Sequence, residues 1–301
     1  MEHVLDGALA HAASVFGLAA VTAPGAWALV TGERAGIAGL RRAGGVLLLV
    51  GAMLHLIAGA AVVEGPVVRA VTTLLSGTFY GASLGIYAGG ALGTLVLPTL
   101  VLPTLAPPAP APPAPALATP APARWGLLAA FGAALGAAWG LARLGHAATE
   151  GTWSAAVGWT TLHVAAAVLW LGGIGMATVG GAAARARFRP VAVGCVVVLV
   201  ATGGLRAVQV LEAGAGRIAA GDLLPGVAWI GALGMKGVAV AAVAVCAART
   251  WRAMRPERAK LLEQAPVAEA GTAVEGALVA ELYGVAVVIL LGALLGRLPT
   301  P

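Results

Sequence analysis

Apolar residues fall into eight long runs along the chain, separated by polar connectors that are mostly short. A run of about 20 apolar residues can cross the hydrocarbon core of a bilayer as one helix. The strand-length alternation of apolar and polar residues that transmembrane strands show is absent. The pattern predicts membrane-spanning helices at about 8–30, 44–63, 70–97, 125–144, 156–180, 191–211, 225–248 and 273–296.

The third run has two possible endings, because its apolar sequence continues to Leu102. It is either one tilted helix or a helix followed by an interfacial piece that is broken at Pro98 and Pro103. Proline ends or kinks helices because it lacks the N–H donor and its ring clashes with the preceding turn.

A Pro/Ala-rich stretch, PTLAPPAPAPPAPALATPAPA, follows the third run at 103–123. Its fixed φ angles and missing donors favour an extended, polyproline-like spacer. We therefore divide the chain into an N-terminal three-helix membrane part (1–102), a linker (103–124) and a five-helix membrane domain (125–301).

Composition narrows the class of protein. Of the 301 residues, 60% are hydrophobic and only 10% are charged, whereas a soluble domain carries about 25% charged residues. The net charge of +6 does not point to nucleic acid, because the basic residues lie in connectors between apolar runs. The expected fold is all-α: a polytopic membrane helix bundle with about eight transmembrane helices and the lipid bilayer as its partner.

The connector charges predict the orientation of the bundle. One set of connectors holds Arg34, Arg41, Arg42, Arg124, Arg185, Arg187, Arg189, Arg249, Arg252, Arg255, Arg258 and Lys260. The other set holds only Arg69, Arg143, Arg217 and Arg297, with Arg206 nearby. Basic residues concentrate on the cytoplasmic side. We therefore expect both termini outside, the Pro/Ala linker in the cytoplasm and the protein in the inner membrane.

With this orientation, all five histidines fall in the outer half of the protein. They are His3, His11, His55, His146 and His163. Neutral imidazole is the commonest protein metal ligand and suits copper. His146 and His163 are joined by a short polar connector, so we expect them to form an outward-facing metal site, with His55 and His11 as further candidate ligands. The alternative is that each histidine is a hydrogen-bonded interior or interfacial side chain.

Two charged residues fall deeper in the apolar runs. Lys236 lies near the middle of the seventh run and Glu281 in the inner half of the eighth. A lone charge at such a depth costs about 2.5–3.5 kcal/mol on insertion scales. We therefore expect an intramembrane charged pair, either structural or part of an ion path. Arg206 and Gln209, three residues apart on the sixth run, are expected to close the outer end of the same polar seam.

Five pieces of the second half occur in an order that resembles the CopD family, the copper resistance D membrane proteins. They are GHA (145–147), LHVAAAVLWLGG (162–173), FRPVAVGCVVVLVATGGLRA (188–207), WIGALGMK (229–236) and ELYGVAVVILLGALLGRLPTP (281–301). Together they cover roughly residues 143–301. The first three apolar runs fit the family's eight-helix layout only in outline.

The resemblance implies a copper-handling membrane protein that moves copper inward or works with a periplasmic copper carrier. His146 and His163 match the family's histidines, and Lys236 and Glu281 match its intramembrane charges. The Pro/Ala linker is not a family feature that we know. We expect no fused copper-binding extracellular domain, and we therefore expect any such carrier to be a separate chain.

We therefore expect a protein that takes up or transports copper ions through the outer histidine site. Two alternatives stay open. One is an accessory or scaffolding subunit of a larger complex with other membrane subunits. The other is a b-type cytochrome, in which two histidines on different helices hold haem b. Catalysis is not expected, because the sequence shows no nucleophile–base constellation, phosphate-binding loop or dinucleotide fingerprint.

Overall fold

The computed structural model describes residues 2–31, 38–61, 63, 66–76, 78–101, 121–144, 154–180, 182–219, 223–253 and 267–295. Regular structure in these ranges is entirely α-helical, with eight helices of 23 residues or more and one of nine. They are α1 (Glu2–Thr31), α2 (Ala38–Ala60), α3 (Val67–Leu75), α4 (Phe79–Val101), α5 (Ala121–Arg143), α6 (Ala155–Val179), α7 (Ala182–Ala219), α8 (Leu223–Ala253) and α10 (Val267–Leu295).

Six helices of the described part are long and apolar enough to cross a membrane: Leu5–Trp27, Gly39–Ala60, Phe79–Val96, Ala155–Val179, Arg185–Gln209 and Ile230–Arg249. A shorter apolar segment, Val279–Leu295, lies in α10. The prediction of an all-α, multi-pass membrane protein is therefore confirmed at this level. The number of crossings and the side on which the termini lie stay predictions.

The third apolar run differs from its prediction as one helix at 70–97. The structure divides it into α3 and α4, with a break after Leu75. The side chain of Thr78 accepts a hydrogen bond from Gly81 N at 3.0 Å and so caps the start of α4. At the other end, α4 continues through Pro98 to Val101. Arg41 of α2 donates from Nη2 to the Leu95 carbonyl at 3.2 Å, a contact that ties α2 to this end of α4.

The linker also proves shorter at its C-terminal end than predicted. Helix α5 begins at Ala121, so 121–124 are helical. The remainder of the linker, 103–120, lies outside the described residues.

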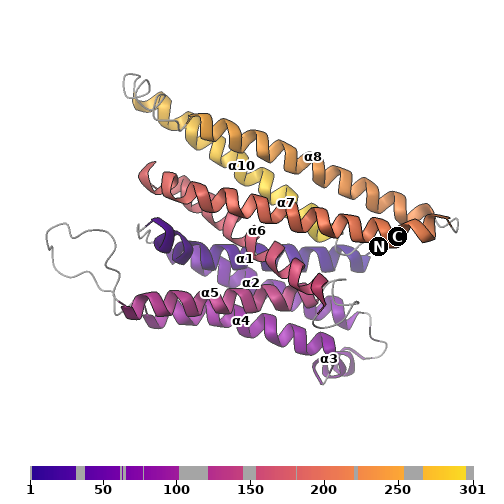
Figure 1. Cartoon of the computed structure of the whole chain (residues 1–301). Helices are drawn as coiled ribbons and strands as arrows, with labels where there is room; N and C mark the ends of the chain where they lie inside the picture. The colour runs from indigo at the N-terminus through magenta and orange to yellow at the C-terminus, as the bar shows by residue number, and fades with distance from the viewer. Residues whose placement is uncertain are drawn as a thin grey trace.

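Helix α1 is the central element, in contact with α2, α4, α5, α6, α7 and α10. Figure 1 shows α8 and α10 on one side of it and α4 and α5 on the other. Small residues bring these helices close together: an added Cβ on Gly17 would lie 2.7 Å from Leu48 N and 2.8 Å from Gly44 O. Membrane helices associate through such contacts because lipid gives no hydrophobic drive between them.

The ends of the helices also fix how the bundle is arranged. Ala8 and Ala12 near the start of α1 pack against Ala293 near the end of α10. α1 therefore begins, and α10 ends, at the same end of the bundle, as Figure 1 also shows.

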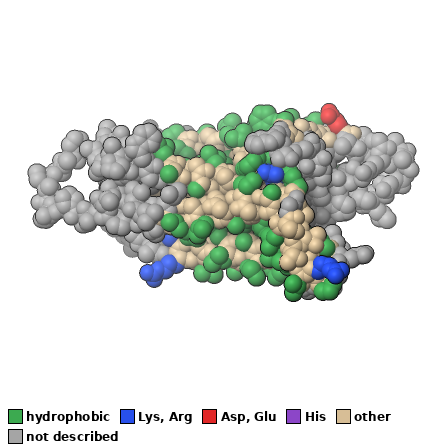
Figure 2. Space-filling view, turned by 90° about the horizontal axis from the view of Figure 1, so that it is seen from below, with side chains coloured by type: hydrophobic (Ala, Val, Ile, Leu, Met, Phe, Trp, Pro, Cys, Tyr) green, Lys and Arg blue, Asp and Glu red, His purple; other side chains and the backbone are tan. Residues whose placement is uncertain are grey.

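The surface of the bundle is largely apolar. Figure 2 shows hydrophobic side chains spread over the middle of one face, with Lys and Arg side chains mostly toward its two ends. Large side chains such as Leu49, Val197 and Val238 are 66%, 61% and 72% exposed. An exposed apolar belt of this kind is what lipid contact requires.

We expect Gly17→Ala to destabilise the protein by about 1–3 kcal/mol, since the new methyl group would overlap backbone atoms of α2. The measurement is the thermal unfolding midpoint in detergent. Gly39→Ala in α2 is the control, because an added Cβ there meets nothing within 4 Å. Equal midpoints for the two variants would contradict close α1–α2 packing.

Candidate functional site

His11 of α1 and His55 of α2 lie face to edge inside the bundle. Their ring centroids are 6.4 Å apart and the rings are nearly perpendicular, at 87°. The register comes from Gly51, where an added Cβ would collide with the Ser14 side chain. Because α1 and α2 run in opposite directions, one turn further along α2 puts His55 beside His11. His55 is fully buried.

Two tyrosines of α4 hold this region of α2 in place. Tyr80 Oη donates to the His55 carbonyl at 2.6 Å, and Tyr87 Oη donates to the Leu48 carbonyl at 3.2 Å. Tyr87 is fully buried, and its ring centroid lies 6.0 Å from that of His55. The imidazole of His55 is therefore enclosed between His11 and Tyr87.

His163 of α6 is held by Thr202 of α7. Its Nδ1 lies 2.8 Å from Thr202 Oγ1, which in turn lies 2.6 Å from the Val198 carbonyl oxygen. A carbonyl oxygen only accepts, so the single hydroxyl proton goes to Val198 and the hydroxyl accepts from His163. This network assigns the proton of a neutral His163 ring to Nδ1, which leaves the lone pair on Nε2. Gly203 gives the ring room, since an added Cβ there would lie 3.3 Å from Cε1.

The packing of α6 on α1 puts His163 at the level of His11. An added Cβ on Gly172 would touch Ala19 and Ala23, and one on Gly180 would touch Trp27, so the two helices run parallel. His163 lies nine residues before Gly172 on α6. Because the two helices are parallel, it is level with about residue 12 of α1. We call His11, His55 and His163 the histidine layer.

Lys236 and Glu281 are not brought together, in contrast to the predicted charged pair. An added Cβ on Gly292 of α10 would lie 3.1 Å from Lys236 Nζ. Glu281 lies 11 residues before Gly292 on the same helix, which is about 16 Å at 1.5 Å per residue. Val243 of α8 packs on Gly284, so Glu281 lies toward the opposite end of α8 from Lys236. Glu281 is only 4% exposed.

The other predicted site residues have mixed outcomes. Arg206 Nη1 donates to Gln209 Oε1 at 3.3 Å, so these side chains do lie together on α7. His146, the first ligand proposed from the sequence, lies outside the described residues. Its distance to His163 therefore stays a prediction.

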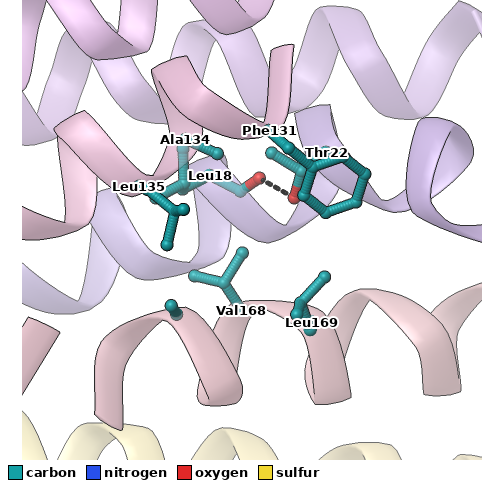
Figure 3. Close-up of a pocket in the computed structure, with 8 residues that line it drawn as sticks. Leu18, Thr22, Phe131, Ala134, Leu135, Val168 and Leu169 are labelled. Atoms are coloured by element: carbon teal, nitrogen blue, oxygen red, sulfur yellow. Dashed lines mark hydrogen bonds between the residues drawn. The ribbon is translucent and has the colours of Figure 1, made fainter. Parts of the chain in front are cut away.

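The histidine layer is not a closed metal cage. In the ranges that the structure describes, no three His, Cys, Asp or Glu side chains lie close enough to hold one metal ion. A cavity of about 30 Å³ lies elsewhere, between α1, α5 and α6, and Figure 3 shows it lined by side chains such as Leu18, Phe131 and Val168. The hydroxyl of its one polar residue, Thr22, is bonded to the Leu18 carbonyl at 2.7 Å. The side chains that line this cavity therefore offer no metal ligand and no charged group.

Comparisons with known proteins add no assignment: no family model, curated protein or solved structure matches this chain. The CopD resemblance therefore rests only on the pieces quoted from the sequence.

Two residues of the site were missed in the sequence. Tyr87 lies in an Ala/Gly-rich run and gave no signal beyond its aromatic ring. Thr202 belongs to the TG pair at 202–203, which entered the family resemblance but was given no role. Its part in holding His163 depends on the packing of α6 against α7, which sequence spacing does not reveal.

We expect Thr202→Val to leave the Nδ1 donor of His163 buried without an acceptor, at a cost of about 1–3 kcal/mol. Nitrogen NMR of the ring should show wild-type protein with the proton on Nδ1 and the variant with a tautomer mixture. Thr202→Ser keeps the hydroxyl and serves as the control. A wild-type spectrum in Thr202→Val would contradict the assigned tautomer.

Proposed function

We propose that this chain handles copper in the inner membrane, taking up or transporting copper ions through the histidine layer. The observation that carries the proposal is the gathering of His11, His55 and His163 from three helices at one level of an apolar bundle. Placing polar side chains within the apolar part of a membrane costs free energy, so residues of this kind usually have a function. Imidazole nitrogen is a ligand that suits copper.

The spacing of the first two rings supports an ion between them. With metal–nitrogen bonds of about 2.0 Å, two imidazoles on one ion have centroids at most roughly 6.3 Å apart. The observed 6.4 Å is close to this limit, and binding would also require the rings to turn from their face-to-edge arrangement so that a nitrogen of each faces the ion.

A site of few ligands suits transport better than storage. Conduction requires binding that is strong enough for entry and weak enough for exit. His163, with its Nδ1 tied to Thr202 and its lone pair on Nε2, supplies a further nitrogen at the same level. A hydrogen bond at one ring nitrogen orients a histidine whose other nitrogen binds a metal.

The orientation predicted from the connector charges is consistent with this proposal. The connector charges favour eight crossings with both termini outside, which puts the end at which α1 begins on the outer side. The histidine layer would then face the outside, and His146 stays a further ligand predicted from the sequence. A separate periplasmic copper carrier is the natural donor in this arrangement.

The test is copper binding to the purified full chain in detergent. We expect bound Cu⁺ in wild-type protein, and affinity at least about tenfold lower in His11→Ala and in His163→Ala, since each removes a nitrogen ligand. Tyr283→Phe, at a position 71% exposed on α10, is the matched control. An absorption spectrum of the same sample tests the haem alternative.

Unchanged copper content in the His11→Ala, His163→Ala double variant would refute the ligand assignment. A Soret band that shifts on reduction would favour the cytochrome instead. Copurification with other subunits, with neither metal nor haem bound, would favour the scaffold.

A further inference from the structure

Arg143, in the last turn of α5, is a buried cation in contact with two aromatic rings. Its guanidinium carbon lies 4.5 Å from the centroid of the Phe79 ring of α4 and 4.7 Å from that of the Trp139 ring of α5. Arg143 is only 8% exposed. Because a guanidinium keeps its proton in proteins even when it is buried, the positive charge persists here. The two ring faces stabilise this charge through cation–π contacts.

The N–H donors of Arg143 are a separate resource, because a cation–π contact uses the charge of the group and not its hydrogen-bonding capacity. A guanidinium carries five N–H donors. Nε of Arg143 is buried without a hydrogen-bond partner, and no carboxylate of the described residues forms an ion pair with the group. Buried charges in proteins are normally paired. The guanidinium therefore has both the charge and the donors to bind an anion.

The site lies where the apolar part of the bundle ends. Phe79 is the first residue of the apolar segment Phe79–Val96, and the next residue, Tyr80, donates to the carbonyl of His55. Arg143 is thus at the same end of the bundle as the histidine layer. Figure 1 shows the short helix α3 at this end of α4. In a bilayer, the anions found at such a boundary are the phosphate groups of lipids.

Arginine suits a phosphate ligand. Two parallel N–H···O bonds join a guanidinium to a phosphate group, and these charge-assisted bonds are stronger than neutral ones. The contacts with Phe79 and Trp139 limit the freedom of the Arg143 side chain. Less conformational entropy is therefore lost when its N–H groups bind a ligand.

We propose that Arg143, held by Phe79 and Trp139, binds a phosphate group at this end of the bundle, and that the phosphate belongs to a lipid headgroup. An inorganic phosphate ion offers the same chemistry, so the experiment separates the two sources. The site does not share a residue with the histidine layer, and this inference does not depend on copper binding.

The test measures binding to the full chain in a maltoside detergent, which carries no phosphate, with phosphatidylglycerol or inorganic phosphate as the titrant. We expect the Kd for phosphatidylglycerol to rise about tenfold in Arg143→Gln, since the charge-assisted hydrogen bonds are lost. Arg143→Lys keeps the charge but not the paired donors and should lie in between, which also covers a folding defect in the Gln variant. Arg69→Gln, at an exposed position of α3, is the matched control and should bind as wild type does.

Two acidic residues of nearby connectors, Glu64 and Glu150, lie outside the described residues, so the comparison is repeated in a Glu64→Gln, Glu150→Gln background. Sensitivity to Arg143→Gln that arises only in this background would mean that a carboxylate of the chain pairs with Arg143, and would overturn the proposal. Equal lipid affinity in wild type, Arg143→Gln and Arg143→Lys would overturn it as well. Binding of inorganic phosphate but not of lipid, lost in Arg143→Gln, would support the phosphate site and overturn the lipid source.

Discussion

The close contact of α1 with its neighbours determines where every interior polar group of this bundle lies. Gly17 and Gly44 let the backbones of α1 and α2 meet, and Gly172 does the same for α6. At such short distances neither helix can slide without backbone overlap. These glycine contacts therefore fix the register of the helices against one another. The register in turn determines which side chains lie at the same level of the bundle. The histidine layer follows from these contacts rather than from attraction between the histidines.

Several hydroxyl groups in this interior donate to a carbonyl of their own helix. Ser14 bonds to the Ala10 carbonyl, Thr22 to Leu18 and Thr202 to Val198, each one turn back on its own helix. Such bonds leave the hydroxyl oxygen able to accept from another helix. Thr202 uses this capacity for His163, and an apolar residue at that position could not do so. Tyr80 and Tyr87 instead use backbone carbonyls of α2.

The long apolar helices could be predicted from the sequence, because length and composition alone identify a membrane span. The division of the third run could not, since Thr78 acts as a cap only once the chain has turned there. The same limit applies to tertiary pairs. Lys236 and Glu281 are natural partners by charge, yet the packing of Val243 on Gly284 sets them at different depths. Hydrophobic pattern predicts helices, but side-chain contacts set their register.

For the histidines, the sequence put His146 and His163 first, whereas the structure describes His11, His55 and His163 and leaves His146 outside its described residues. His11 and His55 were weaker candidates because nothing in the connector 32–37 reveals how two antiparallel helices align. The alignment comes from Gly51 against Ser14, a contact between residues far apart in the sequence.

A chain that moves an ion must resolve a conflict between ligation and release. Strong ligands in a complete shell would stop the ion, and an apolar interior without ligands would exclude it. Two rings 6.4 Å apart provide an incomplete shell. A third ring, which Thr202 orients, adds a nitrogen at the same level. If the chain transports copper as proposed, such an incomplete set of nitrogen ligands favours an exchangeable site over a storage site, because it limits how strongly the ion is bound.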